Sequence, residues 1–152
     1  MTNSTSRTVL HIDDDPQVLR MIRHQLKGLG YEVVSLDNPS KAVGMLLKNE
    51  YRVVILDIDM PGYNGLDVLR QIKKQDGGIQ VIMLTGFVSM TVVLQSLRWG
   101  AEACFFKPLT DVKPLASAVE EAFAKLDRWW ETLRDLTNRK RLATSCLEES
   151  QS

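Results

Sequence analysis

Short apolar runs alternate along the chain with longer stretches in which apolar residues recur at helical spacing. Val53–Leu56 is apolar at consecutive positions, a pattern typical of a strand buried on both faces of a sheet. Five runs are predicted to be strands: Val9–Ile12, Tyr31–Leu36, Tyr51–Leu56, Ile79–Leu84 and Ala103–Phe106. Repeats of strand then helix favour a parallel sheet with helices on both faces. We therefore predict an α/β fold with a doubly wound, five-stranded parallel sheet.

The stretches between the runs carry start and stop signals for helices. Gly28 and Gly30 follow the first apolar-periodic stretch and end its helix. Pro39 suits an early helical position and opens the second helix. A turn at Met60–Gly65 separates the third strand from the third helix, and the fifth helix is expected to begin near Asp111.

The composition is that of an ordinary globular protein. The chain has 152 residues, 44% hydrophobic and 25% charged, with 19 basic and 19 acidic side chains. The length fits one domain plus a short addition, and the balanced charge does not indicate a polyanion-binding surface. No stretch approaches the ~20 apolar residues of a membrane helix, and Met1–Thr8 lacks the apolar core of a secretory signal. Cys104 and Cys146 show neither metal-ligand nor disulfide spacing, so we expect a cytoplasmic protein.

Polar residues directly follow four of the predicted strands. Asp13 and Asp14 follow the first strand and Asp57 follows the third. Thr85 follows the fourth strand and Lys107 the fifth. The carboxyl ends of parallel strands open onto one edge of a sheet, where such folds bind their ligands. We therefore expect these side chains to meet in a cleft that binds a divalent cation and accepts a phosphoryl group.

Each group has a chemical role in that cleft. Three converging carboxylates repel one another by on the order of 4 kcal/mol per pair at ~4 Å and an effective dielectric of ~20. A hard cation, Mg²⁺ or Mn²⁺, relieves this repulsion. Asp57, on the central strand, is the candidate nucleophile, because carboxylates form acyl phosphates. Lys107 supplies a positive charge, and Thr85 a hydroxyl, for the phosphoryl oxygens.

Taken singly, each of these residues has a simpler structural explanation. An aspartate after a strand is commonly a turn residue or a helix cap, and Asp15 before Pro16 is interpreted as such a cap. Thr85 before Gly86 fits turn chemistry. The conjunction of an acid pair, an acid, a hydroxyl and a lysine on four strands, in that order, favours a functional site.

Four motifs make the chain resemble the receiver domain of two-component response regulators, a chemotaxis-regulator-like signalling family. They are His11–Pro16, Leu56–Gly62, Leu84–Gly86 and Phe106–Pro108, and the resemblance covers roughly residues 7–126. The resemblance implies a flavodoxin-like sheet with strand order 2-1-3-4-5. It also implies a phosphoprotein switch of a phosphorelay rather than an enzyme, with self-phosphorylation and self-dephosphorylation as its only chemistry.

The resemblance further assigns partners and ligands. It implies that Asp57 takes a phosphoryl group from a histidine kinase or phosphotransfer protein and that the domain then changes its contacts with a downstream protein. It implies that Mg²⁺ is held by Asp14, Asp57 and the backbone carbonyl of Asp59, with Asp13 contributing through water.

The chain departs from the family pattern near the site. The family usually has Tyr or Phe three positions before the lysine, as an aromatic switch, whereas this chain has Cys104. Asp59 adds a carboxylate two positions after Asp57, and Phe87 an aromatic ring two positions after Thr85. Our hypothesis is that Asp59 and Phe87 change the lifetime of the acyl phosphate by altering water access.

The helical pattern continues past the predicted domain. Apolar residues keep alternating spacings of three and four at Val112, Leu115, Val119, Ala122, Leu126, Trp129, Leu133 and Leu136. This stripe predicts a helical extension over residues 127–142 that forms a parallel coiled-coil homodimer, and the alternative is a linker to a further domain. The Ser- and Glu-rich residues 143–152 are predicted to be disordered. The basic residues Arg134 and Arg139–Arg141 lack a surrounding helix-turn-helix, so no nucleic-acid contact is expected.

Other interpretations of the whole chain differ in class. Asp57-Ile58-Asp59 also resembles the nucleophile motif of haloacid-dehalogenase-type phosphatases, but there the Asp-x-Asp lies on the first strand and the acid pair comes last. A second alternative is a scaffold or dimerisation module that is not phosphorylated. A third is the input half of a longer regulator whose output domain is not in this sequence.

Overall fold

The computed structural model describes residues 7–49, 51–87 and 89–150. A parallel sheet is built from strands β1 (Thr8–Ile12), β2 (Glu32–Leu36), β3 (Val53–Asp57), β6 (Gln80–Thr85) and β7 (Ala103–Phe106). Its strand order is β2-β1-β3-β6-β7, which in sheet-strand numbering is 2-1-3-4-5. The predicted fold class and strand order are confirmed.

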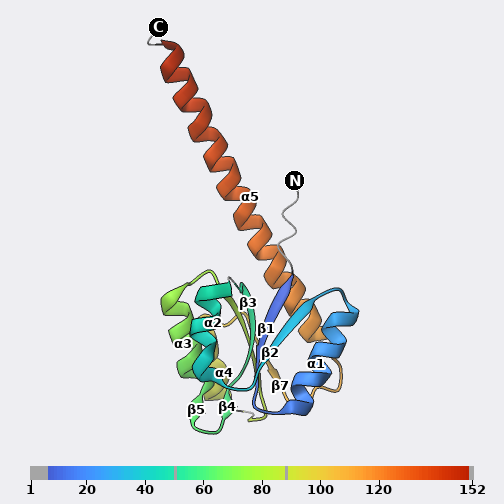
Figure 1. Ribbon diagram of the computed structural model, residues 1–152. Helices are drawn as coiled ribbons and strands as arrows, with labels where there is room; N and C mark the ends of the chain where they lie inside the picture. The colour runs from blue at the N-terminus through green and yellow to red at the C-terminus, as the bar shows by residue number, and fades with distance from the viewer. Residues whose placement is uncertain (1–6, 50, 88, 151–152) are drawn as a thin grey trace. The chain divides into compact units, whose positions relative to one another are not determined.

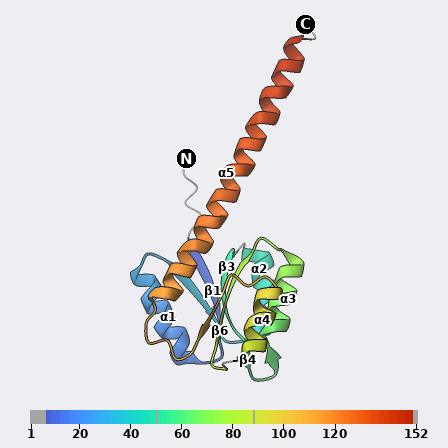
Figure 2. The same ribbon diagram turned by 180° about the vertical axis from the view of Figure 1, so that it is seen from behind.

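Helices cover both faces of the sheet. They are α1 (Pro16–Gly28), the 3-10 helix η1 (Pro39–Lys41), α2 (Ala42–Asn49), α3 (Gly65–Gln75), α4 (Met90–Arg98) and α5 (Lys113–Ser150). Helix α1 and the first turns of α5 lie on one face, and α2, α3 and α4 lie on the other (Figures 1 and 2). Asp15 caps α1 as predicted, since its side chain accepts a hydrogen bond from the backbone N–H of Gln17 at 2.9 Å.

The core lies in two layers, one on each side of the sheet. Val53–Leu56 is completely buried, as expected for a strand covered on both faces. Leu69 and Ile72 of α3 belong to a core cluster with alternate sheet residues such as Leu10. The other layer is closed by buried residues of α1 and α5: Ile22, Leu26, Leu115 and Val119. In the described part of the chain, no helix combines the length and apolarity needed to cross a bilayer.

The loop after β3 holds more structure than the predicted turn. Two short strands, β4 (Asp59–Met60) and β5 (Tyr63–Asn64), pair there as an antiparallel hairpin. Gly62 lies at its tip with φ +77°, a left-handed conformation that glycine adopts without steric cost. Asn64 then caps α3 by accepting a hydrogen bond from the N–H of Leu66 at 2.9 Å. The hairpin therefore links the end of β3 directly to the start of α3.

The prediction of disorder from residue 143 is wrong for residues 143–150, because α5 continues to Ser150. No glycine or proline follows Pro114, so no residue interrupts the helical backbone. The Thr144 hydroxyl donates to the carbonyl of Lys140 at 3.0 Å within the added turns. Residues 151 and 152 lie outside the described residues.

The chain divides within α5 into two units. The first ends at Ala122, one helical turn before the predicted boundary at residue 126, and the second begins at Phe123. In the second unit large apolar side chains are exposed to solvent, among them Trp129, Trp130 and Leu133 at 61%, 53% and 50%. An ion pair between Asp135 and Arg139, one turn apart, adds local support to the helix.

Candidate functional site

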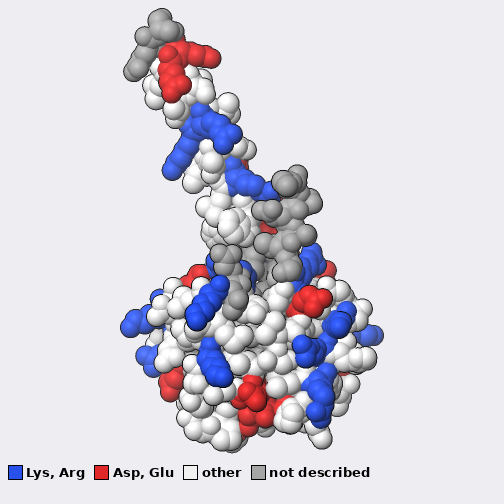
Figure 3. Space-filling view, viewed as in Figure 1, with Lys and Arg blue, Asp and Glu red and all other residues white. Residues whose placement is uncertain are grey.

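Three carboxylates converge at the carboxyl end of the sheet, where the sequence predicts them. Asp13 follows β1 and is fully buried, Asp57 ends β3 and is 1% exposed, and Asp14 is exposed. One carboxylate oxygen from each lies within 4.8 Å of the other two. Figure 3 shows acidic side chains gathered on the surface near the end at which Figure 1 draws β4. The predicted acid cluster is therefore present.

Lys107 reaches this cluster from the residue that follows β7. Its Nζ lies 2.7 Å from Asp13 Oδ2 and 3.2 Å from Asp57 Oδ2. Its backbone N–H donates to the carbonyl of Thr85 at 2.8 Å, and the Lys107–Pro108 peptide is cis. One ammonium group therefore bridges two buried carboxylates.

Local backbone hydrogen bonds orient the two buried acids. Asp13 Oδ1 accepts from the N–H of Asp15 at 2.9 Å, and Asp57 Oδ1 accepts from the N–H of Asp59 at 3.2 Å. Each acid thus has one oxygen held by a backbone N–H group two residues ahead, while Oδ2 faces Lys107. Both aspartates are turn residues and also members of the carboxylate cluster, so the simpler explanation of each one does not exclude the functional one.

A glycine brings the start of α3 against the backbone of Asp57. Gly65 donates its N–H to the carbonyl of Ile58 at 2.8 Å. A Cβ atom at Gly65 would lie 2.3 Å from the carbonyl oxygen of Asp57 and 2.5 Å from Cα of Ile58. Only glycine fits this close approach, so Gly65 fixes the backbone that carries the Asp57 carboxylate.

The remaining predicted residues are placed less centrally. Thr85 is fully buried, and its hydroxyl accepts a hydrogen bond from the N–H of Phe87 at 3.0 Å. The side chain of Asp59 is exposed, whereas its backbone N–H contacts Asp57. The structure therefore brings together the three carboxylates and Lys107, with Thr85 beside them through its backbone bond to Lys107.

Cys104 fills the position at which the family usually has an aromatic residue. It lies on β7 opposite Met83 of β6, is half-buried, and packs against the core cluster on the α3 side of the sheet. Burial raises the pKa of the Cys104 thiol, so the side chain stays neutral and behaves as a small core residue. Phe106, two residues on, is 38% exposed and is the aromatic residue of β7 nearest to Lys107 in the sequence.

Burial and neighbouring charges shift the pKa values of Asp57 and Lys107. Two effects raise the pKa of Asp57 to about 7: burial is the larger, and repulsion from Asp13 is the smaller. Lys107 acts in the opposite direction and lowers it. Burial alone would lower the pKa of Lys107, but its hydrogen bond to Asp13 and the charges of both carboxylates outweigh burial and raise it. Lys107 is therefore a permanent cation, and its single charge does not neutralise all the carboxylates around it.

The residues of this edge fit a hard divalent cation. All the candidate ligand atoms are oxygens, and they come from three carboxylates within 4.8 Å of one another. Mg²⁺ and Mn²⁺ prefer such ligands. Burial first, and repulsion from Asp13 second, raise the pKa of Asp57, and a cation held by these oxygens would relieve that repulsion.

Sequence reasoning gave no role to one polar residue behind the cluster, although it lies within the first motif. His11, on β1, is fully buried, and its Nε2 lies 3.8 Å from Asp13 Oδ2. Burial, with a smaller contribution from the positive charge of Lys107, lowers the pKa of His11 to about 3, so the imidazole is neutral. The available signal was a histidine inside an apolar strand run, two positions before Asp13 and hence on the same face.

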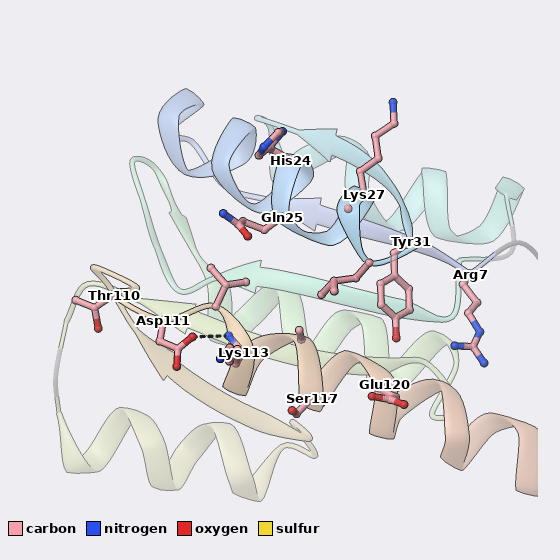
Figure 4. Close-up of a pocket in the computed structure, with 14 residues that line it drawn as sticks. Arg7, His24, Gln25, Lys27, Tyr31, Thr110, Asp111, Lys113, Ser117 and Glu120 are labelled. Carbon is pink, nitrogen blue, oxygen red and sulfur yellow. Dashed lines mark hydrogen bonds between the residues drawn. The ribbon is translucent and has the colours of Figure 1, made fainter.

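Hollows of different size lie on the described surface of this unit. One of about 390 Å³ adjoins the acid cluster at Asp14 and is walled by Asp37, Asn38 and Tyr63, among others. A larger groove of about 1150 Å³ lies between α1 and α5 and contains no residue of the acid cluster (Figure 4). In that view His24 lies on the α1 side and Glu120 on the α5 side.

The fold and the strand-edge site together define a class of phosphoacceptor-type α/β domains, and known structures agree. A response regulator receiver domain protein from Clostridium thermocellum matches with a TM-score of 0.74 and 30% identity, over 80% of this chain and 98% of that one. The response regulator TrrA from Thermotoga maritima, solved in complex with Mg²⁺ and BeF, matches with a TM-score of 0.69 and 30% identity, over 76% of this chain and 97% of that one.

The sequence comparisons give the family. The family model "Response regulator receiver domain" matches residues 9–120. The C4-dicarboxylate transport transcriptional regulatory protein DctD of Pseudomonas aeruginosa is 37% identical over 100 residues, which are 66% of this chain and 22% of that protein. The chain spans between about a fifth and a half of the length of such curated relatives. This chain belongs to the response regulator receiver domain family, as its motifs predicted.

Proposed function

We propose that this chain is a phosphoryl-accepting switch in which Asp57 receives the phosphoryl group. The donor is the phosphohistidine of a histidine kinase or phosphotransfer protein in the cytoplasm. An oxygen of Asp57 attacks phosphorus, the phosphorus–nitrogen bond breaks, and the donor imidazole leaves with the electron pair of that bond. The observation that carries the proposal is the position of Asp57 Oδ2, 3.2 Å from the Lys107 ammonium within the three-carboxylate cluster.

Each neighbouring group has a defined part in this proposal. Asp14, Asp57 and the backbone carbonyl of Asp59 would hold Mg²⁺ or Mn²⁺, with Asp13 acting through water, and the cation would stabilise charge on the transferring phosphoryl group. Lys107 would bind one phosphoryl oxygen. The Thr85 hydroxyl would donate to another after leaving Phe87, to which it is now hydrogen bonded.

The chemistry stops at the protein's own carboxylate. An acyl phosphate on Asp57 forms and is hydrolysed in the same cleft, so the domain modifies itself and turns over no separate substrate. The two states differ by the charge and hydrogen-bonding capacity of one phosphoryl group, which is sufficient to bias contacts with a downstream protein. The alternative scaffold function leaves the buried, mutually repelling carboxylates without a purpose.

Intact-mass spectrometry tests the phosphoacceptor proposal. The protein is incubated with Mg²⁺ and a small-molecule acyl-phosphate donor, beside Asp57→Asn and the control Asp67→Asn, which removes an exposed carboxylate of α3. We expect the parent and the control to gain one phosphoryl group and Asp57→Asn to gain none. Absence of the gain in the parent, under conditions that modify another receiver domain, would support the scaffold interpretation.

A homodimer through the second unit is also proposed, on a separate observation. The stripe of alternating three- and four-residue spacing passes through Trp129, Leu133 and Leu136, all of which are exposed. Because α5 continues to Ser150, the same spacing extends to Lys140, Ala143 and Leu147. A parallel two-stranded coiled coil would bury this stripe, and a single lysine within it would favour two strands in one register.

A further inference from the structure

A buried imidazole stands directly behind the acid cluster. His11 is 0% exposed, and neither of its ring nitrogens has a hydrogen-bond partner in the described part of the chain. Its Nε2 points toward Asp13, 3.8 Å from the Oδ2 atom that Lys107 contacts. An unsatisfied buried polar atom costs on the order of 1–3 kcal/mol. Leucine would fill similar space without that cost. Packing alone therefore does not explain a histidine at position 11.

A second residue with an unsatisfied polar atom lies next to His11 in the sheet. Ser35 of β2 is the register partner of His11 in the parallel β1–β2 pair, which places the two side chains on the same face of the sheet. The Ser35 Oγ is buried and has no hydrogen-bond partner among residues 7–49, 51–87 and 89–150. A neutral imidazole has one donor and one acceptor, and a serine hydroxyl can donate to that acceptor. Ser35, His11 and Asp13 therefore form a series of complementary groups.

The position of Lys107 explains why this series would be needed. Its one ammonium group now lies 2.7 Å from Asp13 and 3.2 Å from Asp57. When Lys107 binds a phosphoryl oxygen on Asp57, Asp13 Oδ2 loses its close cation. His11 Nε2, a buried nitrogen 3.8 Å from that oxygen, is then in place to donate to it.

We propose that His11 is a positioning residue for Asp13. Its Nε2–H donates to Asp13 Oδ2 when Lys107 moves to the phosphoryl group, and the Ser35 hydroxyl fixes the required tautomer by donating to Nδ1. This rests on the proposed function and deepens it, because it names what holds Asp13 in the phosphorylated state. Groups that hydrogen bond to metal-binding carboxylates orient those carboxylates. Loss of such a group typically lowers metal affinity by about 10- to 100-fold.

Two substitutions at position 11 separate hydrogen bonding from packing. In His11→Gln, a side-chain N–H group can reach the place of Nε2, whereas His11→Leu fills similar volume and has no donor. The probe is beryllofluoride with Mg²⁺, titrated by calorimetry against the parent, both variants and Asp57→Asn. We expect about tenfold weaker binding for His11→Leu and less than about threefold for His11→Gln. Equal affinity for beryllofluoride in the parent and both variants, or an equal loss of affinity in the two variants, would overturn the proposal.

The imidazole also reports its own state by ¹⁵N nuclear magnetic resonance. We expect the Nε2–H tautomer in the parent, a shift of the Nε2 resonance on addition of Mg²⁺ and beryllofluoride, and a change of the Nδ1 resonance in Ser35→Ala. An Nδ1–H tautomer that persists with the ligand bound would overturn the proposal even if the position 11 variants fail to fold. Failure of the parent to bind beryllofluoride would instead overturn the proposed function. The two results can be told apart, because a fault in the proposed function removes binding by the parent, whereas the role of His11 predicts weaker binding in His11→Leu alone.

Discussion

The strand edge of the receiver domain and the helix beyond Phe123 depart from ordinary burial in opposite directions. At the strand edge, Asp13 and Asp57 are charged residue types almost fully removed from solvent. In the helix, Trp129 and Trp130 are large aromatic residues more than half exposed. Charged side chains are rarely buried without a partner, and large apolar patches are rarely left in solvent. Each region therefore lacks a different kind of interaction, and this difference underlies the two proposals.

The two regions call for different ligands because they lack different interactions. The strand edge has an excess of negative charge beside one ammonium group, so it would be completed by a cation and a phosphoryl group. The helix has apolar area at coiled-coil spacing, and each Å² removed from water would contribute about 25 cal/mol. A second copy of the same helix supplies a matching stripe. Substitutions in each region separate these two kinds of incompleteness.

The largest effect is expected from closing the space at Gly65. In Gly65→Ala the added Cβ would meet the Asp57 carbonyl oxygen at 2.3 Å, so the start of α3 or the end of β3 must move. We expect a loss of roughly 3–5 kcal/mol in the free energy of unfolding and no phosphoryl gain. Urea unfolding and intact-mass spectrometry measure these two effects.

Gly44→Ala is the matched control for Gly65→Ala. Gly44 lies inside α2, and a Cβ there meets nothing within 4 Å. Because alanine favours the helix over glycine, we expect this variant to gain about 0.5–1 kcal/mol and to be phosphorylated normally. Similar losses in the two variants would contradict the conclusion that the close approach to Asp57 is specific to Gly65.

The helix side of the comparison is tested by a charge in the apolar stripe. Leu133→Glu places a carboxylate at the predicted dimer seam in both copies, and we expect the dimer to lose roughly 3–4 kcal/mol. Sedimentation equilibrium measures the change. Leu142→Glu is the control, because Leu142 is exposed but falls outside the three- and four-residue spacing. A monomeric parent, or equal effects of the two substitutions, would contradict the coiled coil.

The buried carboxyl group of Asp57 predicts a pH dependence of stability. With its pKa raised to about 7, folded Asp57 stays protonated at pH values where the unfolded carboxyl, at 3.8, has ionised. Stability is therefore lost as pH rises from about 4 to about 7. Between pH 5 and pH 8, without divalent cation, we expect the parent to lose roughly 2–3 kcal/mol relative to Asp57→Asn. Urea unfolding at both pH values measures this, and parallel profiles would contradict the raised pKa.

The sequence predicts the elements that are built from continuous patterns. Val53–Leu56 reveals a doubly covered strand because every position is apolar, and strand ends then place Asp57 and Lys107 at one edge. The β4–β5 hairpin was missed because two-residue strands have no measurable periodicity. Helix α5 was ended too early because the Ser- and Glu-rich composition after residue 142 resembles disorder, although no residue there breaks a helix.

The hydrogen-bonding partners of the site are harder to predict than its members. His11 and Ser35 are far apart in sequence, and only the register of β1 against β2 places them side by side. Thr85 is the contrasting case, because the sequence indicates turn chemistry there and its hydroxyl accepts a hydrogen bond from the N–H of Phe87, only two residues ahead. The sequence pattern within one strand predicts which face of the sheet a side chain occupies. Which side chains become neighbours across two strands depends on the register between those strands, and the pattern within a single strand does not give that register.

The smallest expected effects concern the lifetime of the acyl phosphate. Phe87 is 60% exposed, and its N–H holds the Thr85 hydroxyl, while the Asp59 side chain is exposed two residues after Asp57. We expect Phe87→Ala to admit water and speed dephosphorylation severalfold, and Asp59→Asn to alter the rate by less than about tenfold, under ~1.4 kcal/mol in barrier. Loss of label from the phosphorylated variants measures both rates. Unchanged rates in both variants would contradict the hypothesis that Asp59 and Phe87 set the lifetime by controlling water access.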